Sequence, residues 1–317
     1  MELPQLKIDR LLPRVPIIQG GMAVRVSTAS LAGAVAREGG IGVIAATGMS
    51  VKELKKEIQM ARSLADGGII GVNIMVAAHL FIDLVRTSIN EKIDLILTGA
   101  GFSREIFQLG KEGNTPIVPI VSSPKAARLA AKCGAAAVVA EGVEAGGHLG
   151  TDQSIRTILP LIRDTVKIPV IAAGGIVNGQ DIADMVKLGA DGVQMATRFV
   201  LSEECSVADE FKQAYLQAKE EDIVIIQSPV GMPGRAIKNA FVELVEQKNV
   251  PKRDQCAHCL KSCTGEYCIL SALVKAKNGR INEGVVFAGK NVFKIKEILP
   301  VKEIINRLVQ EYSAVQA

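Results

Sequence analysis

Eight short apolar segments that alternate with helical stretches constrain the fold of this chain more than any other feature. The segments are four to six residues long and occupy residues 15–19, 41–45, 70–75, 95–98, 117–121, 136–140, 169–173 and 191–195. Stretches with helical periodicity lie between them, at residues 27–38, 51–64, 80–89, 124–132, 153–165 and 179–188. Strands that alternate with helices pair in parallel through right-handed crossovers, and strands without polar alternation belong in a sheet buried on both faces. The sequence therefore predicts an α/β fold, a (β/α)8 or TIM barrel, with a doubly wound open sheet as the alternative.

The composition suits one such barrel with a small additional unit. Apolar residues make up 48% of the 317 residues, which is enough for a large core. A net charge of +4 and an aromatic content of 3% argue against a nucleic-acid binder. Residues 1–14 lack the pattern of a signal peptide, and no apolar run reaches the roughly 20 residues of a membrane span. We therefore expect a cytoplasmic protein that binds neither nucleic acid nor membrane.

The predicted strand ends carry the residues that could do chemistry. In a (β/α)8 barrel the active site lies at the carboxyl ends of the strands. Gly21 and Met22 follow the first strand, Asn73 lies at the third, and Glu141 follows the sixth. The loop after Glu141 contains Gly146, Gly147 and His148. Histidine can transfer protons near neutral pH, so His148 is the candidate acid or base.

A second group of residues predicts a phosphate site. Gly174 and Gly175 follow the seventh strand just before a helix that begins near Asn178, and the eighth strand ends in Gln194, Met195, Ala196 and Thr197. Loops after the last two strands of such barrels often bind phosphate through backbone N–H groups at a helix N-terminus. Glycines are also common in ordinary βα turns, so the pair alone is weak evidence.

Five motifs together resemble the nitronate monooxygenase (2-nitropropane dioxygenase) family of FMN-dependent barrels, which also contains the flavin-dependent enoyl-acyl-carrier-protein reductase II. The motifs are PIIQGGM at 16–22, EAGGH at 144–148, AAGGI at 172–176, GVQMATRF at 192–199 and SPVGMPGR at 228–235. They keep the family's order, although many members carry Gly where this chain has Ala196.

The resemblance implies a role for each matching position. Gly21 and Met22 would line the flavin ring, Asn73 and Glu141 would hydrogen-bond the FMN, and Gly146 and Gly147 would let the backbone approach it. The positions implied to bind the phosphate end are Ala173, Gly174, Gly175, Gln194, Met195, Ala196 and Thr197. His148 would be the catalytic acid or base beside the ring. Simpler interpretations are a turn-forming Asn73 and a solvent-facing Glu141.

Four cysteines close to one another predict a metal centre. Cys256, Cys259, Cys263 and Cys268 form the pattern C-x2-C-x3-C-x4-C in a chain that we expect to be cytosolic. The compact spacing favours an iron–sulfur cluster, [4Fe–4S], over zinc, and unmetallated thiols are the third interpretation. We expect residues 1–205 to form the FMN-binding barrel core. A mostly helical appendage at 206–298 would carry an active-site loop at 228–235 and the cysteines, and a C-terminal helix at 299–317 would return to the barrel.

Three functions fit these features. The first is oxidation of nitroalkanes or alkyl nitronates to carbonyl compounds and nitrite. The second is NAD(P)H-dependent reduction of an enoyl thioester, in which a basic C-terminal region meets an acyl carrier protein. The third is a flavin-free phosphate-binding barrel that acts as an isomerase or a binding protein. The sequence names neither the substrate nor the oligomeric state, for which a homodimer is one arrangement.

Overall fold

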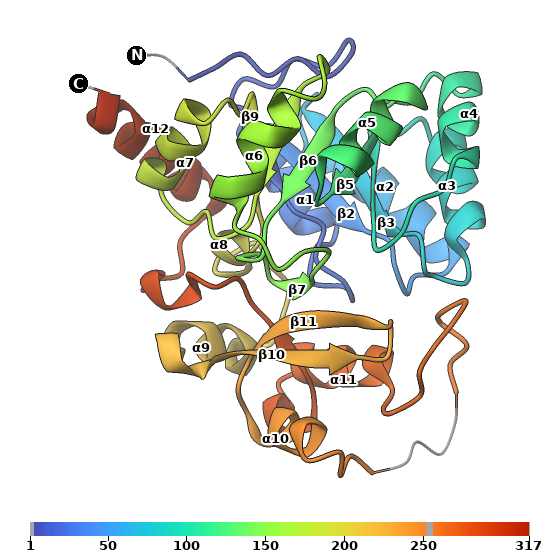
Figure 1. Ribbon diagram of the computed structural model, residues 1–317, viewed down its shortest axis with the longest axis vertical. Helices are drawn as coiled ribbons and strands as arrows, with labels where there is room; N and C mark the ends of the chain where they lie inside the picture. Colours follow the sequence, from blue (N-terminus) through green and yellow to red (C-terminus); the bar gives the residue numbers. More distant parts are fainter. Residues whose placement is uncertain (1–2, 252–255, 317) are drawn as a thin grey trace.

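The computed structural model describes residues 3–251 and 256–316, and its core is a closed barrel of eight parallel strands (Figure 1). The strand order around the barrel is β1-β2-β3-β4-β5-β6-β8-β9, and β9 pairs with β1. Because this pairing closes the sheet, the prediction of a (β/α)8 barrel is confirmed and the open-sheet alternative is wrong. The strands are β1 Ile17–Gln19, β2 Ile41–Ala45, β3 Ile69–Met75, β4 Leu95–Gly99, β5 Ile117–Val121, β6 Val138–Glu141, β8 Val170–Ala173 and β9 Gly192–Met195.

Side chains on both faces of these strands are buried, which explains their continuous apolar character. In β2, Ile41 and Val43 belong to the cluster inside the barrel, whereas Ile44 packs in the layer between the strands and the helices. The side-chain direction alternates along a strand, so a strand covered on both faces needs apolar residues at every position.

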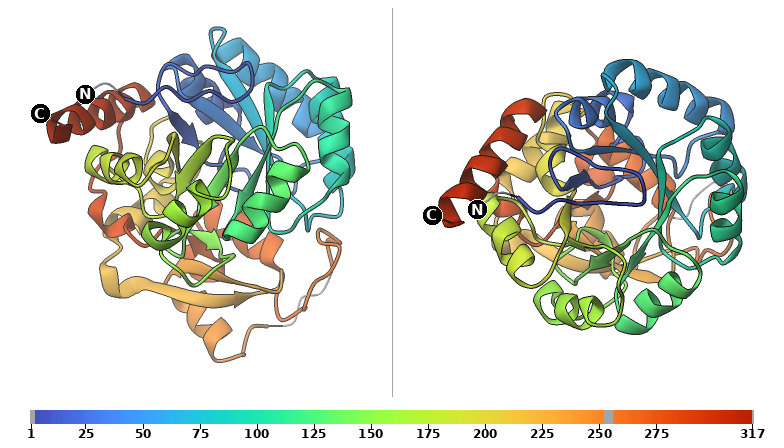
Figure 2. Two further views of the ribbon diagram at one scale, coloured as in Figure 1. Left: turned by 45° about the horizontal axis from the view of Figure 1, so that its top comes forward. Right: turned by 90° about the horizontal axis from the view of Figure 1, so that it is seen from above.

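A ring of helices surrounds the barrel (Figure 2). These helices are α1 Ala29–Arg37, α2 Val51–Leu64, α3 Phe81–Asn90, α4 Glu105–Glu112, α5 Pro124–Lys132, α6 Ile155–Arg163, α7 Gly179–Lys187 and α12 Val301–Gln316. The last of them returns from the far end of the sequence and packs against α7 and α1. The carboxylate of Glu311 in α12 accepts the amide of Gly179 at 2.7 Å. The appendage is therefore inserted between β9 and the helix that completes the ring.

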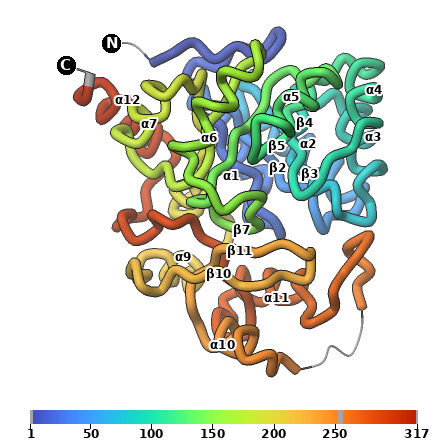
Figure 3. Tube along the Cα trace, in the orientation of Figure 1, coloured from blue at the N-terminus to red at the C-terminus, as the bar shows by residue number. Residues whose placement is uncertain are grey.

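The appendage covers the carboxyl ends of the barrel strands (Figure 3). It contains α9 Asp209–Gln217, β10 Ile223–Ser228, β11 Met232–Ile237, α10 Ala240–Glu246, α11 Ile269–Lys277 and β12 Val286–Phe287. Strands β10, β11 and β12 form an antiparallel sheet, and the short strand β7 Gly147–His148 from the barrel pairs with β11. Within the described residues, no helix is both long and apolar enough to cross a membrane.

Residues 232–235 differ from the expectation of a loop. Proline and glycine disfavour strands, so the sequence predicts a turn there. In the structure these residues lie in β11, paired with β10 on one side and with β7 on the other. Pro233 has no N–H, but its carbonyl accepts the amide of Leu149 at 2.8 Å. Pairing with a segment more than 80 residues away in the sequence thus outweighs the local preference.

Candidate active site

A cavity of about 240 Å³ lies where the carboxyl ends of the barrel strands meet the appendage. The barrel side is lined by predicted site residues, namely Gly21, Met22, Asn73, Glu141, Gly146, Gly147, His148, Gln194, Ala196 and Thr197. The appendage supplies an apolar roof through Val230, Leu260, Leu270, Leu273 and Phe287. The fold thus gathers residues from most of the chain around one largely apolar space.

His148 reaches this cavity from β7, which is an edge strand of the appendage sheet. Gly147 has φ +81°, a left-handed conformation that favours glycine, and it pairs with Arg235 of β11. The side chain of Arg235 donates two hydrogen bonds to the carbonyl of Val143, at 2.7 and 3.2 Å, which braces the loop before β7. The barrel and the appendage therefore fix the position of His148 together.

The half-buried imidazole of His148 contacts a hydroxyl and an aromatic ring. Its Nε2 lies 2.8 Å from Ser228 Oγ at the end of β10, and its ring meets that of Phe287 edge-on with the centroids 5.2 Å apart. Burial lowers the pKa of His148 from 6.5 to about 4, because the charged imidazolium loses its hydration. The ring is therefore neutral at physiological pH and can accept a proton.

Glu141 and Gln194 place two polar side chains deep in the cavity. Burial raises the pKa of Glu141 from 4.5 to about 8, because the charged carboxylate loses hydration in this site. Gln194 is 8% exposed, and its Oε1 is a buried side-chain atom without a hydrogen-bond partner. A buried polar atom without a partner is costly, so this amide fits a ligand that supplies the missing bond.

A smaller cavity of about 50 Å³ adjoins the first and holds the expected phosphate residues. It is lined by Ala173, Gly174 and Gly175 after β8 and by Met195, Ala196 and Thr197 after β9. Glu141, Gly146 and Gln194 border both cavities, which joins them into one continuous site. Gly174 and Gly175 have φ +112° and +71°, so a side chain at either position would strain this turn.

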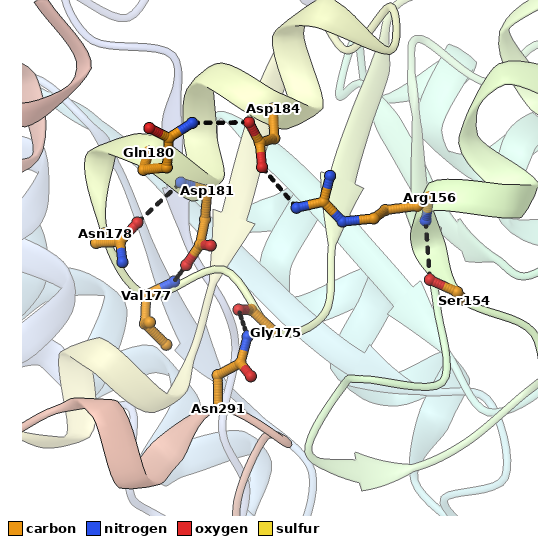
Figure 4. Close-up of polar contacts among 9 residues, drawn as sticks. All are labelled: Ser154, Arg156, Gly175, Val177, Asn178, Gln180, Asp181, Asp184 and Asn291. Carbon is orange, nitrogen blue, oxygen red and sulfur yellow. Dashed lines mark hydrogen bonds and ion pairs between the residues drawn. The ribbon is translucent and has the colours of Figure 1, made fainter. Parts of the chain in front are cut away.

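The N-terminus of α7, expected to bind the phosphate, is occupied by groups of the protein itself. Asn178 Oδ1 accepts the amide of Asp181 at 2.8 Å, and the Asp181 carboxylate accepts the amide of Val177 at 2.9 Å (Figure 4). The amide of Gly179 is bonded to Glu311 of α12. The part of the cradle that faces the cavity therefore consists of the glycine turn and the start of α8 Thr197–Val200. The start of α8 has no side-chain cap.

The returning segment 289–291 also lines the smaller cavity, which sequence patterns did not indicate. The amide of Gly289 donates to Thr197 Oγ1 at 2.9 Å, so the threonine hydroxyl keeps its own proton to donate. Asn291 Nδ2 donates to the carbonyl of Gly175 at 2.5 Å (Figure 4). Nothing in the local sequence pattern distinguishes these residues from an ordinary loop, so no sequence signal marked them in advance.

The prediction of a metal centre at the cysteines is not supported. Among the described residues, which include all four cysteines, no group of three or more His, Cys, Asp or Glu side chains could hold a metal ion. Cys256 and Cys263 are exposed, whereas Cys259 and Cys268 are half-buried. Burial and the nearby thiols of Cys268, Cys263 and Cys256 raise the pKa of Cys259.

The cysteine segment instead packs over the mouth of the barrel. The carbonyl of Cys259 accepts the amide of His79, and the amide of Lys261 donates to the carbonyl of Ala77, at 3.0 and 2.9 Å. Cys259 and Leu260 line the large cavity. The segment therefore forms part of the wall of the site.

A closed (β/α)8 barrel with a deep cavity at its strand ends, a neutral histidine and a glycine-lined cradle has the layout of a barrel enzyme. The chain belongs to the nitronate monooxygenase family, whose model matches residues 5–94 and 81–311.

Similar proteins include enzymes with different names. A (3aS,4S,5R,7aS)-5-hydroxy-7a-methyl-1-oxo-octahydro-1H-indene-4-carboxyl-CoA dehydrogenase from Mycobacterium tuberculosis is 35% identical over 234 residues, which are 73% of this chain. That match spans 65% of the relative, so less than two thirds of its length is covered. A probable nitronate monooxygenase from Staphylococcus aureus is 31% identical over 277 residues, covering 73% of this chain and 78% of the relative. The structure of FabK from Thermotoga maritima superposes with a TM-score of 0.86 at 33% identity, covering 96% of this chain and 94% of FabK.

Proposed function

We propose that the protein is an FMN-dependent oxidoreductase that converts nitroalkanes or alkyl nitronates to carbonyl compounds and nitrite. The family membership and the similarity to the probable nitronate monooxygenase support this activity. The observation that carries it is the half-buried, neutral imidazole of His148 at the cavity.

The two joined cavities fit FMN chemically. The cradle after β8 and β9 suits the phosphate, and the unpartnered Gln194 Oε1 suits an N–H of the ring system. Glu141 is protonated at neutral pH and can donate a hydrogen bond to a hydroxyl or carbonyl oxygen. When bound, the flavin supplies electron-accepting chemistry, with oxygen as the second substrate.

The residues of the chain bind the substrate and accept its proton. His148 accepts the proton on the carbon beside the nitro group, which its neutral ring allows at physiological pH. The apolar roof contributed by Leu260, Leu270 and Leu273 holds the alkyl part and excludes water. A pre-formed nitronate has already lost this proton and needs His148 only for binding.

His148→Ala tests the assignment. We expect turnover of a neutral nitroalkane to fall about 10²–10⁴-fold, the usual contribution of a general base, and turnover of the pre-formed nitronate to fall much less. His79→Ala is a matched control, because His79 lies outside the residues that line the cavity. An unchanged rate with the neutral substrate would exclude the role, and purified protein that is not yellow would favour the flavin-free barrel.

Reduction of an enoyl thioester is the second candidate. Two observations favour it: the M. tuberculosis relative is named for a carboxyl-CoA thioester, and the apolar roof could hold an acyl chain. In that reaction His148 would have to donate a proton, which its lowered pKa disfavours. Stoichiometric oxidation of NADH or NADPH with crotonyl-CoA, together with no nitronate turnover, would select this function. Faster turnover with the acyl-carrier-protein thioester would indicate that partner.

A further inference from the structure

One buried serine holds the segment between β1 and α1 in a closed loop. Ser27 is 0% exposed, and its Oγ accepts the amide of Met22 at 2.9 Å. The amide of Ser27 donates to the carbonyl of Met22 at 3.0 Å, and Ser27 Oγ donates to the carbonyl of Gly20 at 3.2 Å. Ser27 therefore fixes Met22 through both of its backbone groups and also holds Gly20.

Gln19, the last residue of β1, completes this network. Its side chain is 0% exposed, and its Oε1 accepts the amide of Val43 in β2 at 3.0 Å. That bond identifies the oxygen end of the side chain. Its Nε2 donates to the carbonyl of Gly20 at 2.5 Å and to Ser27 Oγ at 2.9 Å. Because Ser27 Oγ accepts two hydrogen bonds, its own proton is the one that it donates to Gly20.

This network determines which way the backbone of Gly21 faces. In a planar trans peptide, the C=O and the N–H point in opposite directions. The carbonyl of Gly20 and the amide of Met22 both point at Ser27. The N–H and the C=O of Gly21 therefore both point away from Ser27, toward the cavity that this loop lines. Neither group has a backbone partner among the described residues.

We propose that Gln19 and Ser27 are positioning residues that present the N–H and the C=O of Gly21 to the flavin ring as a donor beside an acceptor. The pyrimidine part of a flavin carries carbonyl oxygens next to an N–H, which is the complementary arrangement. An added Cβ on Gly21 would lie 2.3 Å from Asn73 Cβ, so the loop lies directly against another cavity residue. The proposal rests on the FMN binding proposed above.

A donor held at the ring affects the two redox states of the flavin differently. Reduction adds electrons to the ring and makes its acceptor atoms stronger, so a hydrogen bond from Gly21 N–H stabilises reduced flavin more than oxidised flavin. Since Ser27 and Gln19 fix the amide before the flavin binds, little ordering of the loop opposes the bond. The two residues should therefore raise the reduction potential of the bound flavin.

The reduction potential of the bound FMN, measured anaerobically against a reference dye, tests the proposal. Ser27→Ala releases the Gly20 carbonyl and the Met22 amide. We expect the ratio of reduced to oxidised flavin at a fixed potential to fall about tenfold, which is about 30 mV for a two-electron couple. The dissociation constant of oxidised FMN should rise by less than this factor. A merely structural role would weaken both redox states equally and leave the potential unchanged.

Three further variants separate positioning from folding. Ser27→Thr keeps the hydroxyl and should keep the wild-type potential. Ser27→Cys has a side chain of similar size that hydrogen-bonds weakly, so it should shift the potential less but in the same direction. Ser88→Ala is the matched control, because Ser88 is also 0% exposed and lies outside the residues that line the cavity. Its hydroxyl donates to the carbonyl of Leu84 at 2.8 Å, and its removal should leave the potential unchanged.

The outcomes distinguish this proposal from the proposed function. An unchanged potential in both Ser27→Ala and Ser27→Cys would overturn the positioning role while leaving FMN binding intact. An equal shift in Ser88→Ala, or a shift in Ser27→Thr as large as that in Ser27→Ala, would also overturn it. Wild-type protein that binds no FMN would overturn the proposed function itself.

Discussion

Replacing Glu141 by glutamine should change how the stability of the flavin-free protein depends on pH. The pKa of Glu141 is raised from 4.5 to about 8 by burial, so the folded protein keeps this proton when the unfolded chain has lost it. Stability from the carboxyl is therefore complete below pH 4.5 and is lost as the pH rises toward 8. Glutamine has nearly the same shape and does not titrate, so Glu141→Gln lacks this loss.

The size of the effect follows from the same shift. A change from 4.5 to about 8 corresponds to roughly 5 kcal/mol at about 1.4 kcal/mol per pKa unit. Water that enters the cavity screens the carboxylate, so we expect about 2–3 kcal/mol between pH 5 and pH 8.5. Urea unfolding of the wild type and of Glu141→Gln at several pH values measures this difference in unfolding free energy. The contributions of all other titratable groups cancel when the two proteins are compared. If the two stability curves run parallel over this range, the carboxyl ionises normally and the reasoning is wrong.

Three further predictions concern the cradle and the histidine. Gly175→Ala should lower flavin content and cost about 1–2 kcal/mol of stability. Gly175 has a φ of +71°, and an added Cβ would lie 2.9 Å from Glu144 Cβ. A yellow variant that is as stable as the wild type would contradict this prediction. Thr197→Val removes the hydroxyl that accepts a hydrogen bond from the Gly289 amide. We expect the affinity for FMN, measured by fluorescence titration, to fall about tenfold. An unchanged affinity would show that Thr197 does not contribute to the phosphate site. Because the pKa of His148 is about 4, kcat/KM for a neutral nitroalkane should decline only as the pH falls toward 4, and a decline centred near 6.5 would show an exposed ring.

Local sequence preferences were sufficient to predict the bounds of helices whose ends are set by nearby residues. The structure places α2 and α5 at the predicted bounds, and Ser123 before Pro124 supplies the N-terminal signal of α5 through its bond to Ala126 N. Helices α4, α10 and α11 were not predicted. The appendage was expected to be mostly helical, but it also carries a sheet whose strand β11 runs through a Pro/Gly motif.

The sequence alone determined the barrel and the location of the site. Strand length, continuous apolar strands and the intervening helices specify a parallel sheet buried on both faces. Once that sheet closes, every residue just after a strand lies on one face, so the predicted ligand-binding residues and His148 gather at the two cavities.

Only the tertiary structure decided which distant groups act on those residues. Ser228 lies 80 positions from His148 and Asn291 lies 116 positions from Gly175, and no local pattern encodes such contacts. The cysteines show the opposite case, because their spacing indicated a metal, whereas the described residues contain no group of side chains that could hold one. Spacing along the chain sets which residues can meet, but burial and hydrogen bonding across the fold set the protonation and the orientation of each side chain.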